Sequence, residues 1–379
     1  MLILSGCQST AEIKTGSQFN QNDLLNDQLF SNHQDIQIET PEEIFAINDE
    51  MRRVVKKITG QEESYSTKAR NIIKHIFNED NVGLAYRSNA NVVAIDAYQN
   101  KSANCLSLTI MAYSLAEEAG LDAVFRNVMV PEYWVRNGEY NMLTGHVNLL
   151  LKKSKKDPKH IVWGTDSVEV DFDPFVNKKD FPTRNISKST VTAMFYNNKG
   201  AMAIVEQDYA KAYRYLKAAA LIAPDYHATW ANLGVLYRLN DQFDYAERSY
   251  KHGIFLDGNN LNTLTNLSIL LSKQNKYDES RAIDAAIIKR RIKNPYYHAL
   301  LADEALYEGN AESAIRHYKR GIKVDKNVHE LYFGLAKAYA TLGKVQLAKA
   351  AMHKAIKLNG ATSINRDYIA KLDLLRANE

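Results

Sequence analysis

The chain has 379 residues, 45% of them hydrophobic, with 48 Lys and Arg against 44 Asp and Glu and a net charge of +4. This length allows two domains, each with its own core. The small net charge and dispersed basic residues give no argument for nucleic-acid binding. Two cysteines, Cys7 and Cys105, are too few for a disulfide framework.

Residues 1–7 end in Leu-Ser-Gly-Cys, which resembles the lipobox of bacterial lipoproteins. The stretch is shorter than a signal peptide and lacks its basic start, so we interpret it as a truncated lipoprotein signal. Cys7 is then the expected lipidation site, and more than one acyl chain gives a stable membrane anchor. Gln8 resembles the sorting pattern of outer-membrane lipoproteins. We therefore expect a lipid-anchored protein of the bacterial cell envelope, on the periplasmic face of the outer membrane.

Residues 8–40 are rich in Gln, Asn, Asp, Ser and Thr, and this composition predicts a flexible tether. A first folded domain is expected over residues 41–185. Pro41, followed by two glutamates, predicts the start of a helix that carries apolar residues at helical spacing up to Val55. A second helix is predicted around residues 69–76, where Ala and Ile recur with the same period.

Cys105 opens an apolar stretch that predicts a helix over residues 105–119, ending at Gly120. A thiol at this position lies at the positive end of the helix dipole, which favours the thiolate. The thiolate is the form that attacks carbonyl carbons. Cys105 is therefore the candidate nucleophile.

Short β-branched and aromatic runs follow the cysteine helix, and turn residues separate them. The predicted strands cover residues 122–130, 146–151, 161–163 and 168–172. Helices followed by several short strands are typical of an α+β domain with an antiparallel sheet.

A base and two candidate acids lie on these strands. His146 can accept the thiol proton, and an acid on a neighbouring strand can orient its imidazole. Asp171 and Asp173 are two residues apart on one strand and point to the same face, so either could do this. Gln99, six residues before Cys105, has the spacing of the oxyanion glutamine of papain-like proteases.

From residue 193 the chain repeats with a 34-residue period and no insertion. Trp230, Leu233, Gly234 and Tyr237 fall on positions that resemble the tetratricopeptide repeat pattern. Small residues recur where the two helices of a repeat would cross. We expect five repeats over residues 193–362 and a capping helix over 363–379. The third repeat departs from the pattern, with polar side chains at the positions 280 and 284, and is expected to be looser.

Stacked helix pairs form a concave surface that suits an extended peptide or a protein partner. The side chains expected on this surface are polar, charged and aromatic. They are Arg238, Asn262, Lys273, Tyr296, Asp303 and Lys337.

Four segments of the first domain look like the bacterial transglutaminase-like superfamily: residues 104–108, 119–123, 146–148 and 170–172. The resemblance covers roughly residues 60–180 and has the order Cys, His, Asp. It implies a papain-like fold, with the cysteine at a helix N-terminus packed on a sheet whose strands carry the His and Asp. Within this resemblance Asp171 is preferred, while Asp173 before Pro174 resembles the Asp-Pro of other members.

The fold expected is thus an α+β papain-like, transglutaminase-like domain followed by an all-α tetratricopeptide repeat solenoid. The resemblance implies a cysteine-dependent hydrolase or acyltransferase acting on peptide or isopeptide amides, with repeats that bind substrate or protein partners. The alternative is an inactive, peptide-binding scaffold of an envelope complex. No cofactor is implied. A zinc site is not expected either, because no second, suitably spaced His accompanies Cys105.

Overall fold

The computed structural model describes residues 16–60, 64–77, 85–87, 90–137, 140–152, 167–172 and 181–359. The chain forms two compact units. The first unit contains Met1–Ile36 and Lys199–Arg290, and the second contains Gln37–Asn198 and Arg291–Glu379. Several predictions lie outside the described residues: lipidation of Cys7, the acid Asp173, the strand over 161–163 and the capping helix over 363–379.

The helix predicted from Pro41 is confirmed but divided in the second unit. It forms α1 (Pro41–Ile44) and α2 (Asp49–Ile58). The division falls at Asn48, whose side chain accepts a hydrogen bond from the Met51 N–H at 2.9 Å and so caps α2. The next helix, α3 (Tyr65–Phe77), also agrees with its apolar pattern.

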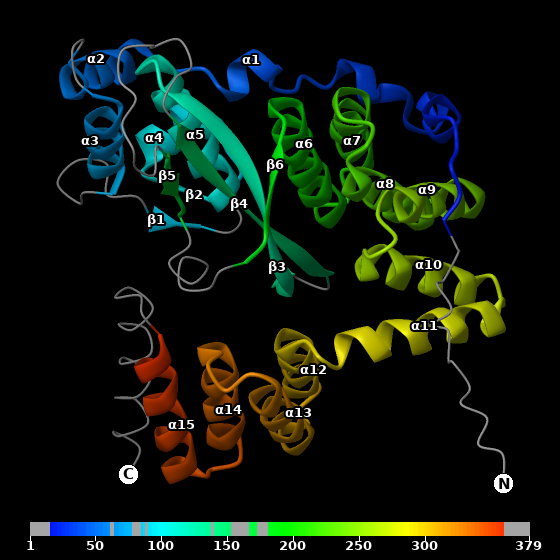
Figure 1. The fold of residues 1–379 in the computed structure, drawn as a ribbon. Coiled ribbons are helices and arrows are strands. Elements are labelled where there is room, and N and C mark those ends of the chain that lie inside the picture. Colours follow the sequence, from blue (N-terminus) through cyan, green and yellow to red (C-terminus); the bar gives the residue numbers. More distant parts are fainter. Residues whose placement is uncertain are drawn as a thin grey trace, which may run out of the picture. The chain divides into compact units, whose positions relative to one another are not determined.

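The cysteine helix α5 (Cys105–Glu118) is central to the second unit, and its predicted bounds are confirmed. Asn104 caps its start by accepting a hydrogen bond from the Ser107 N–H at 2.9 Å. Gly120 ends it with a φ of +73°, a backbone conformation that favours glycine. In Figure 1, α2, α3 and α4 (Ala94–Asn100) surround α5 away from the sheet. This position explains why α5 is apolar on most of its circumference.

The predicted antiparallel sheet is confirmed and has four strands in the order β5-β4-β3-β6. A separate two-stranded parallel sheet lies just before α5. The strands of the larger sheet are β3 (Asp122–Asn137), β4 (Tyr140–Lys152), β5 (Ser167–Val170) and β6 (Thr183–Ile186), and those of the smaller are β1 (Ala85–Tyr86) and β2 (Ser102–Ala103).

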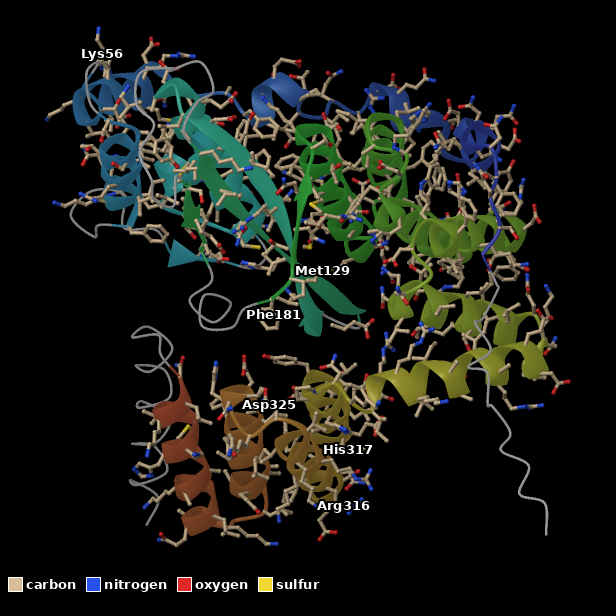
Figure 2. The ribbon with its side chains drawn as sticks, viewed as in Figure 1. Lys56, Met129, Phe181, Arg316, His317 and Asp325 are labelled. Carbon is tan, nitrogen blue, oxygen red and sulfur yellow. The ribbon has the colours of Figure 1, made fainter. Side chains whose placement is uncertain are left out.

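Strand β3 is longer than predicted and continues beyond Pro131. The register with β4 shifts between Val128 and Tyr133. Pro131 lies in this irregularity, where its lack of an N–H donor interrupts no hydrogen bond between the strands. Next to this point, the Met129 N–H donates to the Pro182 carbonyl at 2.8 Å, joining β3 to the segment before β6. Met129 and Phe181 mark this place in Figure 2.

Alternate residues of β4 point to the face of the sheet that is covered by α5. Val147, Leu149 and Leu151 are buried there, together with Phe125 of β3. The Thr109 hydroxyl of α5 donates to the Val147 carbonyl at 3.2 Å. His146 and Asn148 belong to the other alternation of the same strand, so the apolar packing of β4 fixes where these two polar residues lie.

Within the described residues ten helices follow β6, and they pair consecutively in the five predicted 34-residue frames, although the first of them begins at Lys188, before its frame. The predicted repeat period is therefore confirmed over the described residues. The helices are α6 (Lys188–Val205), α7 (Tyr209–Ile222), α8 (His227–Leu239), α9 (Phe243–Leu256), α10 (Leu261–Lys273), α11 (Tyr277–Arg291), α12 (Pro295–Tyr307), α13 (Ala311–Val324), α14 (His329–Thr341) and α15 (Val345–Leu358).

Glycines let neighbouring helices approach closely, within one repeat and between two repeats. A Cβ on Gly234 would collide with the Tyr250 ring, and one on Gly334 would collide with the Tyr318 ring. In the third repeat Ser268 and Asp284 stand at the positions of Gly234 and Tyr250. The Ser268 hydroxyl donates to Asp284 Oδ1 at 2.6 Å, so a polar contact replaces the tyrosine packing.

Residues 21–35, predicted as part of a tether, instead form two 3-10 helices that pack on the repeat helices of the first unit. These are η1 (Gln21–Leu24) and η2 (Asp27–Asp35). Leu24 and Phe30 belong to the buried core of the repeats. The composition of the segment is polar, but these two apolar side chains supply enough buried surface to hold it in place.

Hydrogen bonds also fix this N-terminal arm. Asp27 accepts bonds from the Lys217 ammonium at 2.7 Å and from the Tyr213 hydroxyl at 2.8 Å. Lys217 lowers the pKa of Asp27 by its hydrogen bond, against the effect of burial. The Tyr237 hydroxyl donates to the Leu24 carbonyl at 2.8 Å.

A largely buried ion pair within the second unit joins β3 to Arg291, the last residue of α11. Arg291 donates to both carboxylate oxygens of Glu132, from Nε at 2.9 Å and from an Nη at 3.0 Å. The Asn294 amide donates to the Glu132 carbonyl at 2.8 Å. Two parallel hydrogen bonds between a guanidinium and a carboxylate fix the position and the orientation of both groups.

None of the helices within the described residues has the length and hydropathy that a membrane crossing requires.

Candidate functional site

The structure brings Cys105, His146 and Asp171 together. His146 Nε2 lies 2.9 Å from one carboxylate oxygen of Asp171 and 2.8 Å from the other. Cys105 is close enough to His146 to raise the pKa of its imidazole. Because Asp171 takes Nε2, the ring nitrogen that remains for Cys105 is Nδ1. The three side chains thus form one cluster, in which His146 lies between the acid and the thiol.

His146 is held in its charged form. Burial is the largest influence on its pKa and lowers it, but the hydrogen bonds and charges of Asp171 and Cys105 outweigh burial and raise the pKa to about 10. At neutral pH the imidazole is therefore protonated beside the cysteine. A positive charge in contact with a sulfur favours the thiolate.

Cys105 is held in place by the loop before α5. The Asn104 side chain that caps the helix also donates to Asn91 Oδ1 at 3.3 Å. The Asn91 amide donates in turn to the Phe195 carbonyl at 3.0 Å, and the Val92 N–H donates to the Ser107 hydroxyl at 2.9 Å. Cys105 itself is half-buried. The nucleophile candidate is therefore both fixed and partly accessible.

Asn148 is a member of this arrangement that the sequence analysis did not assign. Its amide nitrogen donates to Asp171 Oδ2 at 3.1 Å, and its Oδ1 accepts from Arg126 Nε at 3.1 Å. The same amide nitrogen also donates to Glu169. Its position two residues after His146 on one strand was the available signal, because alternate strand residues share a face.

Gln99 lies in the last turn of α4 and is exposed. Among the described residues, no hydrogen bond joins Gln99 to Cys105 or His146. Its assignment to an oxyanion site stays a prediction. Asp173, the alternative acid, is outside the described residues, whereas Asp171 is in contact with the histidine.

Three of the predicted partner-binding residues belong to the first unit. Arg238 of α8 lies beside the buried Tyr250. Asn262 of α10 is half-buried, and the Lys273 ammonium lies 5.7 Å from the centre of the Phe243 ring. These contacts account for Arg238 and Lys273 within the fold, and their role in binding stays a prediction.

The other three belong to the second unit, and two of them meet. The Lys337 ammonium of α14 lies 3.3 Å from Asp303 Oδ1 of α12. The Tyr318 hydroxyl donates to the same carboxylate at 2.6 Å. Tyr296 is half-buried near the start of α12. Asp303 thus connects two neighbouring repeats while keeping its side chain at the surface.

Within the part of the chain that the structure describes, no group of three or more His, Cys, Asp or Glu residues is arranged to hold a metal ion.

Comparison with known proteins matches one of the predicted repeats to a known family. The tetratricopeptide repeat family matches residues 329–362, the fifth predicted repeat. No curated protein matches the chain. Among solved structures, pilF of Pseudomonas aeruginosa is 15% identical with a TM-score of 0.28, covering 50% of this chain and 91% of its own.

Two further solved structures are similar to about half of this chain. YrrB, described as a repeat protein with an unusual peptide-binding site, is 12% identical with a TM-score of 0.25, covering 46% of this chain and 90% of its own. A tetratricopeptide repeat protein of Parabacteroides merdae is 16% identical with a TM-score of 0.29, covering 49% of this chain and 74% of its own. The repeat assignment rests on the family match and the helix pairing, since these TM-scores are low.

Proposed function

We propose that the chain is a cysteine-dependent hydrolase or acyltransferase that acts on peptide or isopeptide amides, in a domain of the transglutaminase-like, papain-like class. The observation that carries the proposal is the contact chain Cys105–His146–Asp171. A nucleophile beside a base, with the base hydrogen-bonded to an orienting acid, is the set of groups that acyl transfer through a thioester requires.

The chemistry follows from this arrangement. The Cys105 sulfur attacks the amide carbonyl carbon, a C–S bond forms, and the C–N bond breaks as His146 gives its proton to the departing amine. Water or a second amine then attacks the thioester, His146 accepts its proton, and the C–S bond breaks. Attack by water gives an amidase or protease, and attack by an amine gives a transglutaminase. Both outcomes use the same acyl-enzyme.

The repeats are the proposed means of binding a protein or peptide partner. Tetratricopeptide arrays present extended surfaces built from the first helices of successive repeats. Tyr296, Asp303 and Lys337 supply aromatic and charged groups on α12 and α14. A macromolecular substrate suits such a surface better than a small molecule does. Arg238, Asn262 and Lys273 are the corresponding proposals in the first unit.

Lipidation at Cys7 completes the proposal and would attach the protein to the periplasmic face of the outer membrane. Its support is the lipobox-like sequence before Cys7. Release of the protein from cell envelopes by detergent, and retention of a Cys7→Ser variant in the soluble fraction, would support the anchor. Equal release of both forms without detergent would contradict it.

An electrophilic peptide probe for thiols, applied to envelope extracts, tests the enzyme proposal. We expect covalent labelling of Cys105 that is lost on denaturation and in Cys105→Ala, and reduced in His146→Ala. Proteins that are cleaved or crosslinked by the wild type should be unchanged in Cys105→Ala. Full cleavage or crosslinking by Cys105→Ala would contradict the role of Cys105 as nucleophile. Absence of labelling, cleavage and crosslinking in the wild type would contradict the enzyme proposal and favour a peptide-binding scaffold.

A further inference from the structure

Polar side chains from three neighbouring strands form a continuous row behind the histidine. Arg126 of β3 is paired in register with Asn148 of β4, and Asp171 follows β5 directly. Asn148 is completely buried. It accepts a bond from Arg126 Nε at 3.1 Å and donates to Asp171 Oδ2 at 3.1 Å. The row therefore ends on the carboxylate that contacts His146.

The donors and acceptors allow only one orientation of the Asn148 amide. A guanidinium can only donate, so it must face the amide oxygen. The carboxylates of Asp171 and Glu169 can only accept, so they must face the amide nitrogen. Arg126 also forms an ion pair with Glu169, which holds the guanidinium in place. The chemistry of the three partners thus determines the orientation of the amide.

We propose that Asn148 is a positioning residue that fixes the Asp171 carboxylate against His146, and that Arg126 acts through Asn148. The inference rests on the proposed function. Asp171 has no freedom to turn away from His146 while one of its oxygens is held by the Asn148 amide. In a buried network each bond supports its neighbours, and removal of one member relaxes the others. Partners behind the directly acting groups commonly have this role.

The consequence is a measurable change in the reactivity of Cys105. Without the Asn148 bond, Asp171 stabilises the charged imidazole less well. A weaker positive charge beside the sulfur favours the thiolate less, so alkylation of Cys105 should require a higher pH. A purely structural role for Asn148 would lower stability but would leave this pH dependence in place.

The test follows the iodoacetamide alkylation rate of Cys105 in the full chain against pH, with the Cys105 peptide quantified by mass spectrometry. We expect Asn148→Ala to move the midpoint of the rate upward by about one pH unit or more, and Arg126→Gln to move it less in the same direction. Asn148→Leu, which keeps most of the volume, serves if the alanine variant does not fold. Circular dichroism reports folding.

Asn185→Ala is the matched control, since Asn185 pairs with Arg126 on the opposite edge of β3 but is exposed. Its midpoint should equal that of the wild type. If the wild type reacts at low pH and the folded Asn148 variants have the same midpoint, the positioning role is wrong and the proposed function stands. If the wild type itself behaves as an ordinary thiol, with a midpoint near ~8.5, the proposed function fails and this inference fails with it.

Discussion

His146 Nε2 lies within 2.9 Å of both carboxylate oxygens of Asp171, and the two side chains are only 5% and 1% exposed. This contact commits one ring nitrogen to the acid and directs the other to Cys105. It also keeps the imidazole charged in a place where burial alone would make it neutral. The charge of the imidazole beside Cys105 therefore depends on Asp171, a residue 66 positions after Cys105 in the sequence.

Asp171→Asn should lower the pKa of His146 from about 10, because the amide keeps the shape of the side chain but removes its charge. Titration of the His146 ring protons by NMR measures the shift. Alkylation of Cys105 at pH 6.5 should fall by about tenfold or more, since fewer molecules carry the thiolate. Asp96→Asn, which removes an exposed carboxylate of α4, should leave both readouts nearly unchanged. An unaltered His146 pKa in Asp171→Asn would show that Asp171 does not hold the charge.

His146 should also make stability depend on pH. Its folded-state pKa of about 10 is above the ordinary value of 6.5, so its contribution is complete below pH 6.5 and is lost as pH rises toward 10. We expect His146→Gln to destabilise the second unit by at most a few kcal/mol at pH 6 and by much less at pH 10. Urea unfolding at the two pH values gives the comparison. A larger effect at pH 10 would contradict the assigned charge state.

The N-terminal arm should stabilise the first unit through Phe30. This side chain is 6% exposed, and its ring centre lies 4.6 Å from that of Tyr213. Phe30→Ala is expected to cost about 3–5 kcal/mol, measured as faster hydrogen exchange in α7 and α8. Leu29→Ala is the control, because Leu29 is 37% exposed and should cost about 0.5 kcal/mol or less. Equal exchange in both variants would mean that the arm does not support the repeats.

Gly334 should tolerate no side chain. An added Cβ would collide with the Tyr318 ring, which is itself buried, so Gly334→Ala is expected to cost about 1–3 kcal/mol. Gly258→Ala is the control, since its Cβ would meet only the Ile254 carbonyl at 3.7 Å. Thermal unfolding followed by circular dichroism compares the two. Normal stability of Gly334→Ala would show that α13 and α14 approach less closely than described.

The Glu132–Arg291 pair should behave as a buried ion pair. Arg291→Ala leaves Glu132, 19% exposed, without its partner and is expected to cost about 3–5 kcal/mol. Loss of both side chains should cost less than the sum of the two single changes. Urea unfolding of the four proteins in the cycle measures the coupling. Additive effects would contradict a direct interaction between the two charges.

The periodic features of the fold were predictable from the sequence. The 34-residue period locates the helix pairs because each pair buries the same small and large residues. The bounds of α5 follow from Asn104 and Gly120, which start and end it. The sheet was predicted as antiparallel, but the passage of β3 beyond Pro131 was not, since a bulge depends on its partner strand and not on local propensity.

The arm and Asn148 could not be predicted for a different reason. Leu24 and Phe30 are isolated in a polar segment, and only the tertiary surface of α7 and α8 makes them core residues. Asn148 is one asparagine on a strand, and its importance comes from Arg126 and Asp171, which are brought to it by pairing between strands far apart in the sequence. Cys105, His146 and Asp171 were identified because their order resembles that of a known family.

The pH dependence of Cys105 alkylation in the wild type, measured beside His146→Ala, tests the central claim most directly. We predict that the wild type keeps its rate down to about pH 6, because the His146 charge maintains the thiolate, and that His146→Ala moves the midpoint toward ~8.5. A wild-type midpoint near ~8.5, unchanged in His146→Ala, would contradict the account.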